Sequence, residues 1–202
     1  MSIKIIGITG PSGAGKSILC AYLSKRNIPL IDADKVYHSL LVKDSPCTLS
    51  LCEEFGDGIL SSDGTPDRKK LGAIVFSSNE KLKRLNSIVL KFVIEKINIL
   101  ISELEAEGAK AVGLDAPTLI ESGFSKNCNT VISVLAKKES RVERICTRDN
   151  ISKEAALLRV NAQKPDEFYI ENSDFVITND LDKESFFALV DEIFDTIIPK
   201  ES

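Results

Sequence analysis

The stretch that decides the fold is GPSGAGKS, residues 10–17, which directly follows the apolar run KIIGI at residues 4–8. It fits the pattern G-x-x-x-x-G-K-[ST] of a phosphate-binding loop, or P-loop. Glycine removes side chains from the loop and permits backbone dihedrals that turn successive N–H groups towards an anion. A glycine-rich turn without a ligand is the alternative. The position between an apolar strand and an amphipathic helix favours phosphate binding.

The P-loop and the first helical turn predict a site for ATP and Mg²⁺. We expect Lys16 to compensate charge on the β- and γ-phosphates as a catalytic residue, and the Ser17 hydroxyl to ligate Mg²⁺. The helix that begins near Lys16 adds the positive end of its dipole. The residues expected to contact the nucleotide here are Ser12, Gly13, Ala14, Gly15, Lys16, Ser17 and Ile18.

Composition restricts the partners. The chain has 202 residues, 43% of them hydrophobic and 28% charged, with a net charge of −4. It therefore lacks an overall basic field for nucleic acid or an anionic membrane. The sequence shows neither a signal peptide nor a run of the ~20 apolar residues that span a membrane. Five cysteines without a C-x-x-C pair, and a single histidine, argue against a zinc site or a disulfide framework. We expect a cytoplasmic protein, either a monomer or a weak homo-oligomer.

The hydrophobic pattern predicts strands that alternate with helices. Short apolar runs predict strands at residues 4–8, 28–32, 109–114, 131–135 and 174–178. Helical spacing predicts helices at residues 16–25, 40–55, 67–76, 80–107, 137–148, 153–163 and 184–194. Such alternation indicates an α/β fold, a single domain of residues 1–202 with a mostly parallel sheet covered by helices on both faces. Residues 137–171 are rich in charge, which favours a mobile lid.

Acidic residues follow two of the predicted strands. The second strand ends in Asp32-Ala-Asp34, and ligands of such sheets collect beyond the carboxyl ends of the strands. An acid there can accept the proton of a hydroxyl group or hold Mg²⁺, although aspartate also favours the N-cap of a helix. We expect Asp34 to be catalytic and leave Asp32 open between the two roles. Asp115 is a candidate metal ligand, or else a turn residue before Pro117.

Arginines recur at helical spacing in the charged segment. Arg141, Arg144 and Arg148 are three and four residues apart, so they share a helical face, and Arg159 follows. A solvated charged face is the usual explanation. In a kinase, lid arginines offset the charge of the transferring phosphoryl group. That role is expected most of Arg144 and Arg148.

A GTP switch is disfavoured by two sequence features. The candidate base-reading motif at residues 179–182 has an acid in place of lysine. The stretch at residues 115–118 lacks the glycine of D-x-x-G. The short chain and its late arginines favour a small-molecule kinase.

Further motifs carry a specific resemblance. They are the P-loop, Ile31-Asp-Ala-Asp34, Asp63-Gly64, Asp67-Arg68, Leu71, Val75-Phe76, Leu85-Asn86, Ile88, Pro117, Leu119, Glu121, Arg144, Arg148, Arg159, Gln163, Asp174, Val176, Ile177 and Asn179. On these residues the chain resembles the dephospho-coenzyme A kinase family from Ile5 to about Asn179. The sequence departs from the family pattern in three places. Leu90-Lys91 replace the usual His-Pro, Tyr169 or Glu171 replaces a basic residue, and Thr118 replaces a leucine.

The resemblance implies transfer of the γ-phosphoryl of ATP to the ribose 3′-hydroxyl of dephospho-coenzyme A. It implies Asp34 as the base, Arg144 in a lid and phosphate clamp, and Asn179 near the adenine. From its place on the arginine face, Arg148 is expected to bind the nucleotide. It also implies a helical acceptor region from Arg68 to Ile97, and we expect the whole helical acceptor-binding part to span about residues 36–107. The acceptor residues would be Asp34, Arg68, Leu71, Asn86, Pro117 and Glu121. A kinase for another nucleotide or small hydroxyl compound, and a nucleotide-binding regulator without transfer chemistry, remain the alternatives.

Overall fold

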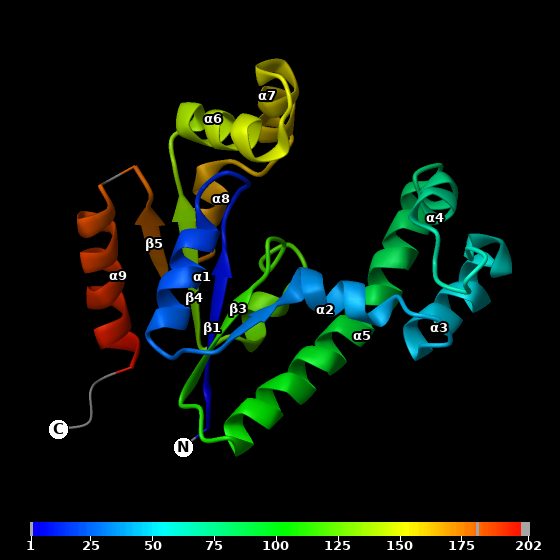
Figure 1. Ribbon diagram of the computed structural model, residues 1–202, viewed down its shortest axis with the longest axis horizontal. Helices are drawn as coiled ribbons and strands as arrows, with labels where there is room; N and C mark the ends of the chain where they lie inside the picture. Colours follow the sequence, from blue (N-terminus) through cyan, green and yellow to red (C-terminus); the bar gives the residue numbers. More distant parts are fainter. Residues whose placement is uncertain (1, 181, 199–202) are drawn as a thin grey trace. The chain divides into compact units, whose positions relative to one another are not determined.

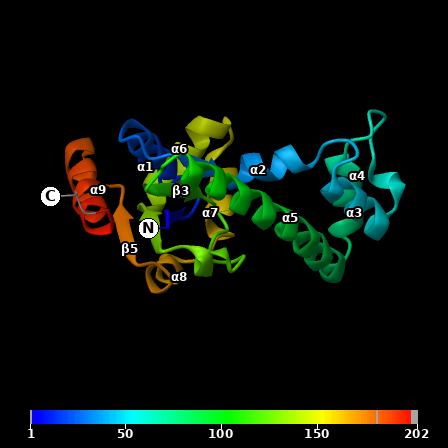
Figure 2. The same cartoon turned by 90° about the horizontal axis from the view of Figure 1, so that it is seen from below.

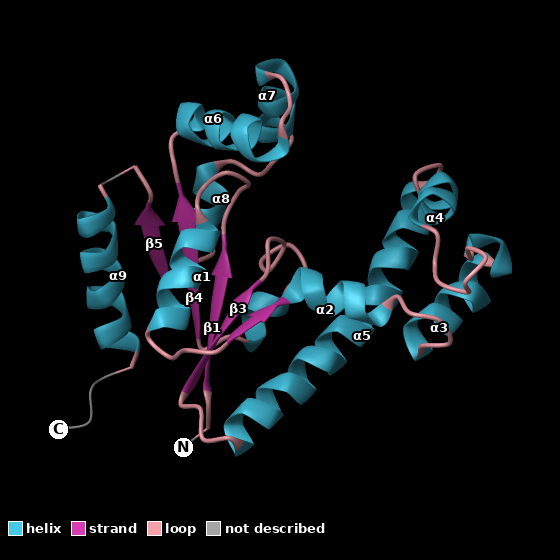
Figure 3. Cartoon of the chain, viewed as in Figure 1, coloured by secondary structure: helices cyan, strands magenta, loops and turns pink. Residues whose placement is uncertain are grey.

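The structure is a computed structural model that describes residues 2–180 and 182–198. The predicted strands are confirmed as β1 (Lys4–Thr9), β2 (Leu30–Asp32), β3 (Ala111–Asp115), β4 (Thr130–Leu135) and β5 (Phe175–Thr178). They form one sheet in the order β2-β3-β1-β4-β5 (Figure 3). β1 pairs in parallel with both β3 and β4, and β4 pairs in parallel with β5. The prediction of a parallel α/β sheet is therefore confirmed.

Helices cover both faces of this sheet, as the apolar strands require. On one face, Ile8 of β1 and Ile132 of β4 belong to a core that includes Leu19 of α1 (Lys16–Lys25) and Phe186 of α9 (Lys183–Ile197). On the other face, a Cβ atom on Gly7 would lie 2.5 Å from the Leu119 side chain. Helix α8 (Asp166–Glu171) contacts β4 and β5 and lies across β5 from α9 (Figure 2). The sheet is thus the middle of three layers.

The chain divides into two compact units. The sheet unit comprises Met1–Ile31 and Leu104–Ser202, and the helical unit comprises Asp32–Glu103. The helical unit contains α2 (Ala33–Leu40), α3 (Pro46–Phe55), the 3₁₀ helix η1 (Asp57–Ile59), α4 (Arg68–Val75) and most of α5 (Asn79–Ala106). Its own apolar core is built from Cys47, Leu51, Ile59, Leu71 and Val75.

The predicted helix at residues 40–55 is wrong in its first part. The hydroxyl of Ser45 accepts from Thr48 N at 3.1 Å, and α3 begins at Pro46. Proline suits the first turn of a helix but interrupts a helix interior, so the chain cannot continue from α2 into α3. The apolar spacing across residues 40–55 had concealed this break. Helices α2, of eight residues, and α8, of six residues, were also missed.

The charged segment forms a small helical layer of its own within the sheet unit. Helices α6 (Lys138–Asp149) and α7 (Lys153–Asn161) pack through Val142, Ile145, Ala156 and Val160. The arrowheads of β1 and β4 point towards this pair (Figure 1). A short 3₁₀ helix, η2 (Phe124–Asn127), precedes β4. Within the described residues, no helix has the length and apolar character needed to cross a membrane.

Candidate active site

The P-loop lies between the end of β1 and the start of α1, as predicted. Gly10, Gly13 and Gly15 have φ values of 133°, 79° and 107°, which side chains rarely adopt. A Cβ atom on Gly13 would lie 2.7 Å from the carbonyl oxygen of Arg141, and one on Gly10 would overlap that of Val134. The glycines therefore also allow the loop to approach β4 and α6 closely. The sequence alone had explained them only by the anion.

The first turn of α1 presents the predicted nucleotide groups. Its N-cap is Gly15, which has no side chain to accept from the first-turn N–H groups. The Lys16 ammonium donates to the carbonyl of Gly10 at 2.7 Å, so it lies over the start of its own loop. Ser17 and Ile18 are exposed, whereas Ala14 is buried. The loop and this turn thus offer a positive charge, an exposed hydroxyl residue and the positive end of a helix dipole.

Asp115 lies at the same edge of the sheet as the P-loop. It ends β3 opposite Ile8 of β1, and the next residue, Ala116, donates its N–H to the Ile8 carbonyl at 3.1 Å. The hydroxyl of Thr9 donates to the carbonyl of Pro117 at 3.2 Å, which ties the following turn to the end of β1. Thr9 is buried directly before the loop, and sequence reasoning had not identified it.

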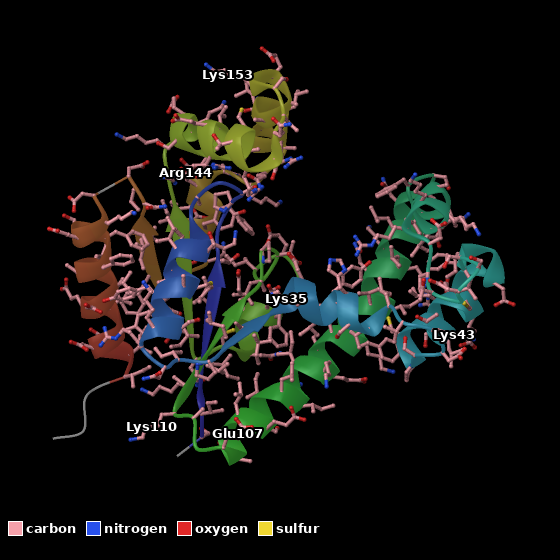
Figure 4. The ribbon with its side chains drawn as sticks, in the orientation of Figure 1. Lys35, Lys43, Glu107, Lys110, Arg144 and Lys153 are labelled. Carbon is pink, nitrogen blue, oxygen red and sulfur yellow. The ribbon has the colours of Figure 1, made fainter. Side chains whose placement is uncertain are left out.

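Arg144 and Asn179 both brace the P-loop. The Arg144 guanidinium donates to the carbonyls of Gly13 at 3.1 Å and Ala14 at 3.2 Å, and to that of Asn179 at 2.8 Å. The buried side chain of Asn179 donates to the Ala14 carbonyl at 2.8 Å. Figure 4 shows Arg144 on the side of α6 that faces the loop. Residues at the ends of β5 and along α6 are therefore joined to the loop through its main chain.

The other arginines that the sequence placed near Arg144 differ in their environments. Arg141 is only 5% exposed, so a solvated face does not describe it. Arg148 donates to the Ser12 hydroxyl at 3.3 Å and to the carboxylate of Asp149, which also pairs with Arg159. The hydrogen bond from Arg148, followed by the contribution of Arg159, lowers the pKa of the Asp149 carboxyl to about 2. Asp149 therefore links α6 and α7 through ion pairs with the two more exposed arginines, Arg148 and Arg159.

The start of α6 depends on a residue that sequence reasoning missed. The carboxylate of Asp180 accepts from Lys137 N at 2.8 Å and from the Ser140 hydroxyl at 3.2 Å. Asp180 follows Asn179 at the end of β5, so the same turn braces the P-loop and caps α6. An acid after a strand was the available signal, but its partner is distant in sequence.

In the helical unit, the two acids after β2 have different settings. Asp32 is the N-cap of α2, and its side chain accepts from Lys35 N at 3.0 Å. Asp34, in the first turn of α2, is exposed. The structure thus gives Asp32 the capping role that the sequence had left open. Asp34 has a carboxylate open to solvent.

The other predicted acceptor residues of the helical unit are spread over α4 and α5. Arg68 is exposed and its guanidinium lies 2.6 Å from Nδ1 of His38 on α2. Asn86 is exposed on α5. Leu71 is 5% exposed and packs in the core of the unit. Leu71 therefore has a packing role in this unit, and its predicted contact with an acceptor stays a prediction.

Two acceptor candidates lie in the sheet unit. Pro117 and Glu121 are both exposed, in the turns after β3. Glu121 lies near the buried Tyr169, where burial and then the Glu121 charge raise the pKa of the phenol to about 12. Tyr169, at the position where a basic residue was expected, is thus a neutral core residue beside α6.

Comparisons with known proteins agree with this geometry. The family model described as dephospho-CoA kinase matches residues 4–184. A dephospho-CoA kinase of Dehalococcoides mccartyi is 35% identical over 88% of this chain and 89% of its own. A crystal structure from Thermus thermophilus superposes with a TM-score of 0.80 at 29% identity, covering 98% of this chain and 99% of the other. A dephospho-CoA kinase structure from Campylobacter jejuni gives a TM-score of 0.70 at 28% identity, covering 96% of each chain.

Proposed function

The chain belongs to the dephospho-CoA kinase family, and from this membership we propose how its residues divide the work of the reaction. The family phosphorylates dephospho-CoA with ATP, the last step of coenzyme A biosynthesis. The protein is accordingly an ATP-dependent kinase. The observation that carries the assignment is a P-loop with left-handed glycines, braced by α6 and β5, inside a match that spans residues 4–184.

The P-loop and α1 bind the triphosphate of ATP. Lys16 compensates charge on the transferring phosphoryl group, where alignment and charge matter more than covalent chemistry. The main chain from Ser12 to Ile18 follows the phosphates. Arg148, which already contacts the Ser12 hydroxyl, adds a second cation, and we assign Asn179, which braces the loop at Ala14, to a position near the adenine.

The residues present fit the Mg²⁺ that kinases of this family use with ATP. The described part of the chain has no cluster of three or more His, Cys, Asp or Glu residues able to hold a metal. Mg²⁺ at such sites takes only one or two protein oxygens beside phosphates and water. The Ser17 hydroxyl and the Asp115 carboxylate are donors of this kind. Held there, Mg²⁺ would supply charge compensation for the phosphates during transfer.

Asp34 is the general base. An exposed carboxylate at the start of α2 is able to accept the proton of the ribose 3′-hydroxyl as that oxygen attacks phosphorus. Arg68 and Asn86 are exposed polar groups of the same unit, and we assign them to contact with the acceptor. We assign this unit, within the predicted bounds of about residues 36–107, to acceptor binding, together with Pro117 and Glu121.

Residues 137–171 serve as the lid. Arg144 contributes positive charge to the phosphates in addition to bracing Gly13 and Ala14. Exclusion of water by such a lid prevents ATP hydrolysis. The net charge of −4 supports small molecules rather than nucleic acid or membrane as partners. We place the enzyme in the cytoplasm, as a monomer or weak homo-oligomer.

ADP release in the presence of dephospho-CoA tests the assignment. We expect acceptor-dependent ADP release, conversion of dephospho-CoA to coenzyme A by mass, and little release without acceptor. Lys16→Ala is expected to lower turnover by at least about 100-fold, whereas Lys25→Ala, at the exposed end of the same helix, leaves it unchanged. Turnover with another hydroxyl compound, but not with dephospho-CoA, would refute dephospho-CoA as the acceptor. Nucleotide binding without turnover on any acceptor would favour a regulator.

A further inference from the structure

Both polar groups of the Ser12 main chain are held, one in each of the two peptide groups that flank its Cα atom. Its N–H donates to Oε1 of Gln163 at 3.2 Å. Its carbonyl accepts from Nε of Arg141 at 3.2 Å. Ser12 lies in the middle of the P-loop, directly before Gly13. Gln163 holds the Pro11–Ser12 peptide and Arg141 holds the Ser12–Gly13 peptide, which contains the Gly13 N–H group. Together they therefore fix the direction of the N–H groups that follow Ser12.

Gln163 connects the two sides. The same Oε1 atom accepts from Nη2 of Arg141 at 2.6 Å. Both partners are donors, so the amide must present its oxygen to them, and the orientation of the side chain is determined by the network. Gln163 is half-buried in the short segment between α7 and α8.

Arg141 makes this arrangement energetically important. Its side chain is 6% exposed, and its carboxylate partner, Asp166, is 3.7 Å away and 47% exposed. A buried guanidinium needs acceptors, because a charge left without them is strongly destabilising. Burial lowers the pKa of Arg141, yet arginine remains charged at physiological pH. The Gln163 oxygen therefore serves the buried cation and the P-loop simultaneously.

We propose that Gln163 is a positioning residue for ATP, acting through the Ser12 N–H group and through Arg141 rather than by contact with substrate. It holds Ser12 so that the N–H groups from Gly13 onwards are arranged for phosphate before ATP arrives. Preorganised donors bind and stabilise charge without the cost of rearrangement. This inference rests on the proposed use of the P-loop for ATP.

Two substitutions separate this role from simple packing. Gln163→Met keeps the length of the side chain but removes the acceptor. Gln163→Glu keeps an acceptor for both donors. We expect Gln163→Met to raise the dissociation constant and KM for ATP by about tenfold or more. The KM for dephospho-CoA should remain within about twofold. Gln163→Glu should retain more ATP affinity than Gln163→Met.

The matched control is Lys164→Met, which places the same side chain at the exposed neighbouring position and should bind ATP like the wild type. Calorimetry with ATP, steady-state kinetics with both substrates and thermal unfolding are measured for every variant. Equal ATP affinity in wild type and Gln163→Met would overturn the proposal. So would weaker binding by Gln163→Glu than by Gln163→Met, or an effect confined to the KM for dephospho-CoA.

Two further results are informative. If Gln163→Met does not fold, Gln163→Asn replaces it, because the amide is kept but is too short to reach both donors. Gln163→Asn is then expected to weaken ATP binding, and unchanged binding would refute the proposal. ATP binding by calorimetry does not require the acceptor. A wild type that fails to phosphorylate dephospho-CoA would therefore refute the proposed function, while the order of ATP affinities would still decide the role of Gln163.

Discussion

The side-chain amide of Asn179 occupies the space into which a side chain on Gly15 would project. From there it donates to the carbonyl of Ala14 at 2.8 Å. The end of β5 thus packs against the turn of the P-loop that begins α1. A residue other than glycine at position 15 would displace Asn179 and lose this bond.

Gly15→Ala is therefore expected to damage the P-loop for two reasons. Its φ of 107° is unfavourable for alanine, and the new methyl group overlaps the Asn179 amide. We expect ATP affinity to fall by about 100-fold or more, as measured by calorimetry. Gly58→Ala is the control, since nothing lies within 4 Å of its Cβ position. Wild-type ATP binding by Gly15→Ala would show that the loop tolerates a different path.

Asp34 and Asp32 form a matched pair for testing the base. Asp34→Asn is expected to lower kcat by about 10²- to 10⁴-fold with ATP affinity unchanged, because it removes the proton acceptor. Rapid-quench or coupled kinetics with calorimetry measure both quantities. Near-normal turnover of Asp34→Asn would refute the assignment.

Asp32→Ala is expected to act on stability instead, since Asp32 caps α2. Loss of an N-cap costs about 1 kcal/mol, and asparagine caps as well as aspartate. Urea unfolding should therefore show a lower midpoint for Asp32→Ala and a wild-type midpoint for Asp32→Asn. A severe loss of kcat in a folded Asp32→Asn would instead place Asp32 in the chemistry.

Substitutions of Arg144 can distinguish its hydrogen bonds to the P-loop from the effect of its positive charge. Lysine keeps the charge but cannot reproduce the planar fork that reaches Gly13, Ala14 and Asn179. We expect Arg144→Lys to lower both the melting temperature and ATP affinity, the latter by about tenfold. Arg144→Met should lower kcat/KM by about 100-fold or more. Loss of kcat in Arg144→Lys with unchanged stability and ATP affinity would contradict the bracing role.

The ion pairs of Asp149 predict a pH dependence. The pKa of this carboxyl is about 2 in the fold, below the ordinary value of about 3.9 expected when unfolded. A lowered pKa stabilises the fold fully above the unfolded value, and the contribution is lost as pH falls towards the folded value. The difference in unfolding free energy between wild type and Asp149→Asn should be constant above about pH 5 and shrink below about pH 4. Urea unfolding across this range measures it. A difference that stays constant down to pH 3 would contradict the pairing.

The sequence predicted local structure well where neighbouring residues alone determine that structure. The P-loop, its flanking strand and α1 are determined by adjacent residues, and the strand runs were all found. The break before Pro46 was present in the sequence but lay within a continuous apolar period. Helical spacing placed Arg141, Arg144 and Arg148 on one face. It could not show that α6 turns Arg141 inwards, because burial depends on α8 and the P-loop.

The acceptor side was predicted less completely for a related reason. Asp32 and Asp34 are two residues apart, and only the start of α2 at Ala33 distinguishes a cap from an exposed carboxylate. Leu71 matched a family motif, and the structure shows that its side chain packs in the core of the helical unit. The contacts of Asn179 and Gln163 with the P-loop join distant parts of the chain, so no local pattern contains them.

The bracing of the P-loop also limits how it can be transplanted. Residues 10–17 match a widespread motif, but Val134, Arg141, Arg144, Gln163 and Asn179 determine the path of their main chain. Grafting the octapeptide alone onto another strand and helix would transfer the motif without its supports. In this protein the conformation of the phosphate loop depends on residues in the second half of the chain, so a transplanted loop would need those residues as well.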